Sequence, residues 1–326
     1  MEIVLENNGF FLHVKNKLFE AGNGNQKQSF HPEKIEAIKV GKGGQITTDA
    51  IFLALEHTIE IIFIDYFGNP KGRIWNNKFG SIATIRKKQV FFAQSSQAMF
   101  LISEFVIRKI QNQHSFLGQI IYSQIENPDK KILEKLNRMK VIERQIKQMI
   151  IDDIPPNPAS LRGWEGTVAR IYFETLSILL PKKYQFENRS GRHANDMFNA
   201  TLNYLYGILY ALVEGALIQA GIDPAVGIWH ADEYNKPVLT YDFIEPYRVW
   251  ADVVLVRLCL ADALSEDSFI KNQKSIWLSG KGKQVVVRSM QQYLDEIVLQ
   301  NKIYRSRKQH LKMEANSLAQ KIMKFE

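Results

Sequence analysis

The sequence lacks the usual residues and motifs of covalent catalysis. Cys259 is the only cysteine among the 326 residues, so no internal disulfide can form. It stands in the apolar run "VVLVRLCLADAL", a setting typical of a small buried hydrophobe. There is no G-x-x-x-x-G-K-[ST] phosphate loop, and no Ser-His-Asp or Cys-His arrangement stands out. Nucleotide hydrolysis and nucleophilic hydrolase chemistry are therefore disfavoured.

Secretory and membrane-spanning signals are also missing. The first residues, "MEIVLENNGFFLHV", alternate like a β-strand and do not place a charged region before an apolar run, so we predict a cytoplasmic protein. The most membrane-like stretch, residues 202–221, is long enough to cross a bilayer but contains Asn203, Glu214 and Gln219. We interpret it as a buried core helix and expect no membrane partner.

Negative charge is in short supply relative to positive charge. The 42 Lys and Arg residues outnumber the 34 Asp and Glu residues, which gives a formal net charge of +8. Because neutralising phosphates releases counterions, a basic protein is suited to a polyanionic partner such as nucleic acid. Surface solubility explains the same excess equally well, so other features have to decide between the two.

The spacing of apolar residues changes along the chain. Up to about residue 80, segments such as "EIVLE", "FFLHVKN" and "IEIIFID" predict β-strands, interrupted by one helix in "QITTDAIFLALEHT" with Thr47 or Thr48 as its N-cap. After Trp75 the helical period holds almost to the end of the chain. The sequence therefore predicts an α+β fold, with a β-domain at residues 1–80 and a mostly α-helical domain at residues 81–326.

Individual helices can be placed in the α-helical domain. The stretch "DDIPPNPAS" interrupts the helical pattern, and Ser160 is a candidate N-cap for the helix after it. The expected helices cover residues 95–113, 131–151, 160–181, 195–220 with Gly221 as a C-terminal cap, 242–264 and, as a closing pair, the chain from about Lys283 onward.

Glu165 is the first candidate for chemistry. It accompanies an apolar helical stripe that includes Val168, Ile171 and Tyr172. A carboxylate at the edge of such a stripe is rarely buried unless it is paired or bound to a cation. The alternative is an ordinary first-turn glutamate, which the helix dipole favours.

The segment "GIWHADEYNKPVLTYDFIEPYR" holds three more candidates. His230 lies in its loop, and Asp242 and Glu245 stand three residues apart. In isolation His230 is a hydrogen-bonded loop residue, and the two acids form a capping box at a helix start. Residues at i and i+3 share a helix face, however, so both carboxylates can point to one place. The loop can bring His230 to the same place, and another helix can bring Glu165 there.

Such a cluster predicts a metal site. Carboxylates with one imidazole suit Mn²⁺ or Mg²⁺, whereas zinc would need more nitrogen or sulfur ligands. In a basic protein this cation is suited to a phosphodiester, whose charge it neutralises. Candidate contacts to the DNA backbone near the ligands in sequence are Arg189, Arg192, His193 and Arg248, with Lys182 and Lys183 as further basic residues.

Four sequence blocks in this order carry a family resemblance: "GGQITTDAIFLALEHTIEIIFIDYFGNPKGRI", "GWEGTVARIYF", "NDMFNATLNYLYGIL" and "GIWHADEYNKPVLTYDFIEPYR". Over nearly its whole length the chain resembles the CRISPR-associated integrase and endonuclease family, the first-numbered protein of the adaptation machinery. The resemblance implies an N-terminal β-sandwich and a helical catalytic domain. It also implies a metal held by Glu165, His230 and Glu245, with Asp242 as a secondary acid.

The resemblance further implies a reaction and partners. In the reaction, a 3′-hydroxyl of a short duplex attacks a phosphodiester at a repeat boundary of a CRISPR array. The implied partners are double-stranded DNA (protospacer and repeat), a second copy of the chain bound through the β-domain, and the small second-numbered adaptation protein. As a metal ligand, His230 should be neutral, because only an unprotonated ring nitrogen binds a metal.

Two other functions stay open on the sequence alone. A metal-dependent nuclease of branched DNA would cut without joining strands. A non-enzymatic DNA-binding scaffold would use Glu165 as a first-turn acid and the Asp242–Glu245 pair only as a helix cap.

Overall fold

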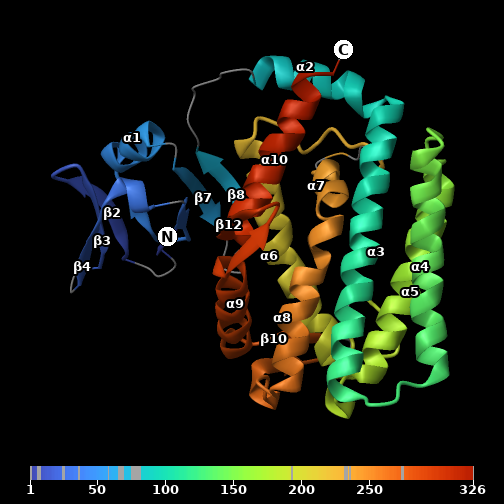
Figure 1. Ribbon diagram of the computed structural model, residues 1–326. Helices are drawn as coiled ribbons and strands as arrows, with labels where there is room; N and C mark the ends of the chain where they lie inside the picture. Colours follow the sequence, from blue (N-terminus) through green and yellow to red (C-terminus); the bar gives the residue numbers. More distant parts are fainter. Residues whose placement is uncertain are drawn as a thin grey trace. The chain divides into compact units, whose positions relative to one another are not determined.

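The computed structural model forms two compact units, Met1–Ala83 and Thr84–Glu326 (Figure 1). The residues that the structure describes are 2–5, 9–23, 26–35, 37–57, 59–64, 70–74, 82–191, 194–230, 234, 236–272 and 275–325.

The N-terminal unit contains two four-stranded sheets, with strand orders β1-β5-β7-β8 and β4-β3-β2-β6. In the first sheet β1, β5 and β7 run parallel, and β8 pairs antiparallel with β7. The strands are β1 (Glu2–Leu5), β2 (Phe11–Lys15), β3 (Leu18–Gly22), β4 (Lys27–Phe30), β5 (Ala37–Val40), β6 (Gln45–Ile46), β7 (Glu60–Ile64) and β8 (Pro70–Ile74).

One apolar core joins the two sheets of this unit. It includes Leu12 and Phe19 from one sheet, Ile38 and Ile61 from the other, and Ala50 from helix α1 (Thr48–Glu56). The predicted helix is therefore confirmed, and its N-cap is the first of the two threonines: the Thr47 hydroxyl oxygen accepts a hydrogen bond from the Ala50 amide at 3.3 Å. The short polar strands β4 and β6 were not predicted, because neither shows an apolar alternation.

The second unit is mostly helical, which confirms the predicted α+β class. Its helices are α2 (Ile82–Ala93), α3 (Ser96–Gln124), α4 (Lys130–Ile151), α5 (Pro158–Leu179), α6 (Met197–Gln219), α7 (Val238–Phe243), α8 (Arg248–Leu260), α9 (Gly280–Asp295) and α10 (Arg307–Met323). Short 3-10 turns lie at Pro32–Lys34 in the first unit and at Lys182–Tyr184, Glu245–Tyr247 and Glu266–Ser268 in the second.

Helix α3 is the longest helix and a central support of this unit. It packs against α4 and α5, and also against α8 and the turn Glu245–Tyr247 (Figure 1). By length and composition α6 could cross a membrane, and half of its most apolar window is buried. It packs against α7, α8, α9 and α10, which fits the interpretation of this segment as a core helix.

Helix ends show where local sequence signals succeed and fail. Gly221 has a positive φ of 84° after α6, and its amide donates to the Ile218 carbonyl at 2.9 Å, as expected for a C-terminal cap. The prediction that Ser160 opens α5 was wrong. The helix begins at Pro158, and Asn157 accepts a hydrogen bond from the Ala159 amide at 2.8 Å, because Asn at the cap and Pro at the first helical position favour this start.

Two hairpins interrupt the helical pattern near the end of the chain, where the sequence predicted helix almost throughout. They pair β9 (Phe269–Lys271) with β10 (Ile276–Leu278), and β11 (Ile297–Gln300) with β12 (Ile303–Ser306). Asn301 and Lys302 between β11 and β12 both have positive φ, at 50° and 64°, as a two-residue hairpin turn requires. Cys259 is buried as expected, and burial raises the pKa of its thiol to about 12.

Candidate active site

The helical unit contains a cavity with charged residues in its wall and a volume of about 650 Å³. Glu165, His230 and Glu245 all line it, as do Arg189 and Arg248. Residues that are distant in the sequence therefore meet because α3, α5, α6 and α8 pack together. Other residues in its wall are Lys109, Gln113, Arg162, Tyr206, Tyr210 and Trp229.

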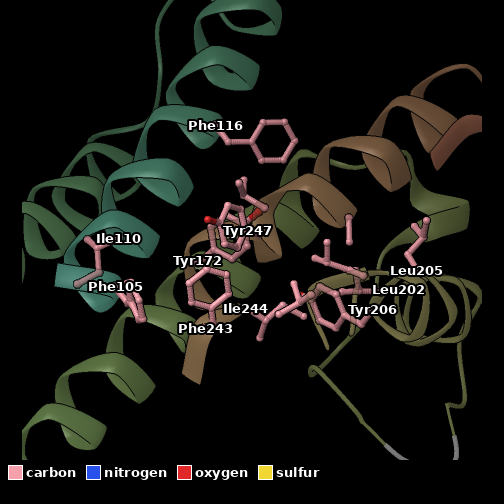
Figure 2. Packing of buried hydrophobic residues seen from close by; sticks show 14 of the residues in the cluster. Phe105, Ile110, Phe116, Tyr172, Leu202, Leu205, Tyr206, Phe243, Ile244 and Tyr247 are labelled. Carbon is pink, nitrogen blue, oxygen red and sulfur yellow. The ribbon is translucent and has the colours of Figure 1, made fainter. Parts of the chain in front are cut away.

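An apolar core supports the elements that form this cavity. Figure 2 shows the packing of its buried side chains, among them Phe105 of α3, Tyr172 of α5, Tyr206 of α6 and Phe243 of α7. The rings of Phe105 and Phe243 meet edge to face at 5.6 Å between centres. Such contacts fix α3 against the segment that carries Glu245.

Glu165 and Glu245 converge on one ammonium group. Lys109 lies on α3 and is 6% exposed, and its Nζ donates to Glu165 Oε1 and, at 2.5 Å, to Glu245 Oε2. The second oxygen of Glu245 accepts from Arg248 Nε at 2.8 Å. Because α5 begins at Pro158, Glu165 lies beyond the first turn, and the interpretation as a first-turn acid is wrong.

Charge holds this cluster in its ionised form. Burial alone would raise the pKa of Glu245, but Arg248 and Lys109 outweigh it and lower that pKa to about 2. Burial alone would lower the pKa of Lys109, but the carboxylates of Glu245 and Glu165 keep it above its ordinary value. Glu245 and Lys109 are therefore both charged at neutral pH.

Asp242 holds the loop that presents His230. Its buried carboxylate accepts backbone N–H groups of Ile228 at 2.9 Å, Trp229 at 3.0 Å and His230 at 3.2 Å. One of its oxygens also lies 2.6 Å from Nδ1 of the His230 ring. This bond engages Nδ1, which leaves Nε2 as the ring nitrogen for a ligand.

The alternative interpretation of Asp242 and Glu245 as a capping box is wrong. Asp242 lies inside α7, and Glu245 opens the 3-10 turn that follows. The Asp242 carboxylate binds a loop more than ten residues upstream instead of the amides of its own helix. The spacing of three residues thus reflects two separate turns of chain rather than one helix start.

The carboxylates of Glu165 and Glu245 and the imidazole of His230 are donor groups suited to a divalent cation. Two carboxylates already share one cationic atom, and an imidazole lines the same cavity, which is a suitable donor set for Mn²⁺ or Mg²⁺. Within the described ranges, no three His, Cys, Asp or Glu residues are grouped closely enough to hold one metal ion. Lys109 now takes the position between the carboxylates.

Arginine and tyrosine side chains form the basic part of the cavity. The Arg248 guanidinium lies 5.2 Å from the ring centre of Tyr206 and 5.5 Å from that of Tyr210. Arg189 lies 5.3 Å from the same Tyr206 ring. Stacked guanidinium groups are well suited to phosphate recognition. The other two predicted DNA contacts, Arg192 and His193, lie outside the described residues.

Two buried charged residues of this region were missed by the sequence analysis. Lys109 shares the apolar stripe of α3 with Phe105, and Asp252 is fully buried in α8. Asp252 accepts hydrogen bonds from the hydroxyls of Tyr172 and Tyr206, each at 2.9 Å. A charged residue inside an apolar helical stripe was the available signal in both cases.

The C-terminal helix α10 supports the turn that carries Glu245. Glu314 of α10 accepts hydrogen bonds from the Tyr247 hydroxyl, two residues after Glu245, and from the Arg108 guanidinium, next to Lys109. The Glu314 carboxylate therefore binds one residue close to Lys109 in the sequence and one close to Glu245. No motif in the sequence of this helix points to these partners, so its role could not be predicted.

Asp252 makes a pH-dependent contribution to stability. Burial raises the pKa of this carboxyl from 3.8 to about 6, although the Tyr172 and Tyr206 hydroxyls oppose the change. The folded protein thus binds the proton more tightly, so this contribution is complete below about pH 3.8 and is lost as the pH rises through about 6. The difference between these two pKa values corresponds to about 3 kcal/mol in the free energy of unfolding.

Urea denaturation of wild type and Asp252→Asn checks this prediction. The unfolding free energy of wild type minus that of the variant should fall by about 3 kcal/mol between about pH 4 and pH 7. A difference that does not depend on pH would show that Asp252 does not titrate in this range.

The fold and cavity define a class: α+β proteins whose helical unit carries a basic cavity with converging carboxylates and a histidine. Within that class, the sequence model described as "CRISPR associated protein Cas1" matches residues 3–292 of the chain. The chain therefore belongs to the CRISPR-associated Cas1 family, as its sequence blocks indicated.

A named relative agrees with this membership, and solved structures share the fold. "CRISPR-associated endonuclease Cas1 1" of Archaeoglobus fulgidus is 27% identical over 313 residues, covering 90% of this chain and 88% of the relative. A casposase bound to integration product has a similar fold, with a TM-score of 0.76 and 24% identity over 99% of this chain and 90% of that one. A Cas6-RT-Cas1--Cas2 complex gives a TM-score of 0.75 and 21% identity, covering 99% of this chain and 35% of that one.

Proposed function

We propose that this chain is a metal-dependent DNA integrase and endonuclease of CRISPR adaptation. It inserts short duplex DNA into a CRISPR array by attack of a 3′-hydroxyl on a repeat-boundary phosphodiester. The observation that carries the proposal is the convergence of Glu165 and Glu245 on one cation position, in a basic cavity that His230 also lines. Family membership and the endonuclease name of a relative support it.

Each polar residue of the cavity has a role in this proposal. Glu165, Glu245 and Nε2 of His230 would hold Mn²⁺ or Mg²⁺, which supplies charge neutralisation at the phosphodiester and activation of the attacking oxygen. Asp242 is a positioning residue, because it fixes the loop backbone and the Nδ1 side of His230. As a ligand, His230 acts in its neutral form.

The arginines position the DNA backbone. Arg189 and Arg248 line the cavity and present planar guanidinium groups that match phosphate oxygens. Arg192 and His193 remain candidates for the same role from their place in the sequence. Holding the phosphodiester in line with the attacking hydroxyl lowers the barrier, since such a displacement depends on placement and needs no covalent enzyme intermediate.

The joining step balances without an energy source. The 3′-oxygen of the incoming strand forms a bond to phosphorus, and the bond from phosphorus to the 3′-oxygen of the target strand breaks. One proton leaves the attacking hydroxyl and one is taken up by the departing oxygen, so one phosphodiester replaces another. If water attacks instead, the same site hydrolyses DNA, which accounts for an endonuclease activity.

The proposed partners follow from the family and the charge. They are double-stranded DNA (protospacer and repeat), a second copy of the chain and the small Cas2-type adaptation protein. A casposase bound to integration product and a Cas6-RT-Cas1--Cas2 complex are among the structures of similar fold. We assign dimerisation to the β-domain at residues 1–80 and catalysis to residues 81–326, and we place the protein in the cytoplasm.

A joining assay tests the proposed function. The purified protein is incubated with Mn²⁺, a supercoiled plasmid containing a repeat, and a short duplex with free 3′-hydroxyls, with and without the Cas2-type partner. We expect covalent joining of duplex to plasmid that stops on addition of EDTA. Hydrolysis products alone, even with the partner present, would point to the branched-DNA nuclease, and DNA binding without either product would point to the scaffold.

A further inference from the structure

We propose that Lys109 is an internal cation that occupies the carboxylate pair in the absence of metal, and that its ammonium moves to Gln113 when a divalent metal binds. The inference rests on the proposed metal site. Lys109 neutralises the two carboxylates before a metal binds, and its displacement sets the affinity of the site for metal.

The contacts of Lys109 place it where a metal would bind. Its Nζ donates to one oxygen of Glu165 and to one oxygen of Glu245. The side chain of Lys109 is 7% exposed and that of Glu245 is 6% exposed, so water screens this contact little. Without a cation, two carboxylates that converge in such a place would repel each other and lose hydration. Lys109 supplies that cation from within the chain.

Lys109 and a metal cannot use the same oxygens at once. Mg²⁺ binds carboxylate oxygens at about 2.0–2.1 Å, which is closer than a hydrogen bond to an ammonium. The Oε1 atom of Glu245 is already engaged by Arg248 at 2.8 Å. A metal between Glu165 and Glu245 therefore needs Oε2 of Glu245, which Lys109 now holds, and the ammonium has to withdraw from that oxygen.

Gln113 offers the withdrawn ammonium an acceptor. It lies one helical turn after Lys109 on α3, is 1% exposed and lines the same cavity. Its Oε1 is buried and has no hydrogen-bond partner in the part of the chain that the structure describes. A buried acceptor without a partner is costly, and side chains four residues apart on a helix are neighbours. The move of Lys109 would satisfy this oxygen.

Metal binding to variants tests the proposal without an activity assay. Calorimetric titration with Mn²⁺ is carried out on wild type, Lys109→Met and the control Lys135→Met, whose lysine pairs with Glu174 at 3.0 Å outside the cavity. Removing the competing ammonium should tighten Mn²⁺ binding by about tenfold or more, because opposite charges at contact distance couple strongly. Lys135→Met should bind like wild type. Equal or weaker binding by Lys109→Met overturns the proposal.

Gln113→Leu provides a second test that keeps the lysine. The variant should bind Mn²⁺ several-fold more weakly than wild type, because the displaced ammonium loses its acceptor. In the Lys109→Met background the same change should have no effect, so the two substitutions form a double-mutant cycle. Unchanged binding by Gln113→Leu would contradict the movement to Gln113, even if Lys109→Met proved too unstable to titrate.

The same titrations separate this inference from the proposed function. If wild type binds Mn²⁺ and Glu165→Gln does not, the metal site stands, and the Lys109 and Gln113 variants then decide on the internal cation. If wild type binds no Mn²⁺, the metal site and the inference both fail.

Discussion

Replacing Glu165 by glutamine should lower the rate of Mn²⁺-dependent strand joining about a thousandfold. That factor equals about 4 kcal/mol of transition-state stabilisation, within the range expected when a catalytic metal is lost. Glutamine keeps the size of the side chain but removes the negative charge that would hold the metal. The measurement is the initial rate of joining with saturating DNA, for wild type and variant side by side.

A matched control exists on the same helix. Glu174 also lies on α5, but it pairs with Lys135 outside the cavity, so Glu174→Gln should join DNA at the wild-type rate. The fold should persist in Glu165→Gln, because Lys109 keeps its contact with Glu245. Strand joining by Glu165→Gln within about tenfold of wild type would be incompatible with a metal held by this carboxylate.

The second large effect is expected for Asp242→Ala. This change removes the acceptor of three backbone amides in the loop from Ile228 to His230 and of the His230 ring. The bond from the Trp229 amide is buried, and those from the Ile228 and His230 amides are part-buried. A buried donor left without a partner costs about 1–3 kcal/mol, whereas a part-buried donor can turn to water, so we expect the free energy of unfolding to fall by about 2 kcal/mol. Urea denaturation measures this loss.

Asp242→Ala should also weaken metal binding, because Nε2 of His230 loses its orientation. Removing a residue that orients a metal ligand typically costs 10–100-fold in affinity. A titration with Mn²⁺ therefore separates a positioning role from a purely structural one. If the variant is destabilised but binds Mn²⁺ like wild type, His230 is not a ligand oriented by Asp242.

Local signals in the sequence were sufficient for much of the fold. Thr47 and Gly221 act through bonds to residues within four positions of themselves, so their caps are visible in the sequence. The long apolar stripes of α3 and α4 likewise predict their helices. The hairpin of β11 and β12 was missed because its strands are four residues long and lie between two amphipathic helices.

The site was predictable in part. Glu165, His230 and Glu245 were expected to converge, and the structure brings all three to one cavity, while their role as metal ligands stays a prediction. The partners of Asp242 were not predictable, because a capping box and an inward-facing acid have the same spacing in sequence. The loop that Asp242 binds is set by tertiary packing.

Lys109 was missed for a related reason. Basic residues were assumed to face solvent or DNA, whereas this lysine extends from an apolar helical face toward two acids distant in the sequence. Only the packing of α3 against α5 and against the turn Glu245–Tyr247 brings those acids to it. No spacing rule within one segment reports such a contact.

Anomalous diffraction from crystals soaked with Mn²⁺ tests the central claim most directly. We predict a peak in the cavity, bonded to Glu165, Glu245 and Nε2 of His230, with the Lys109 ammonium withdrawn from at least one carboxylate. A cavity without a peak at saturating Mn²⁺, or a metal held only by residues outside it, would contradict the proposed active site.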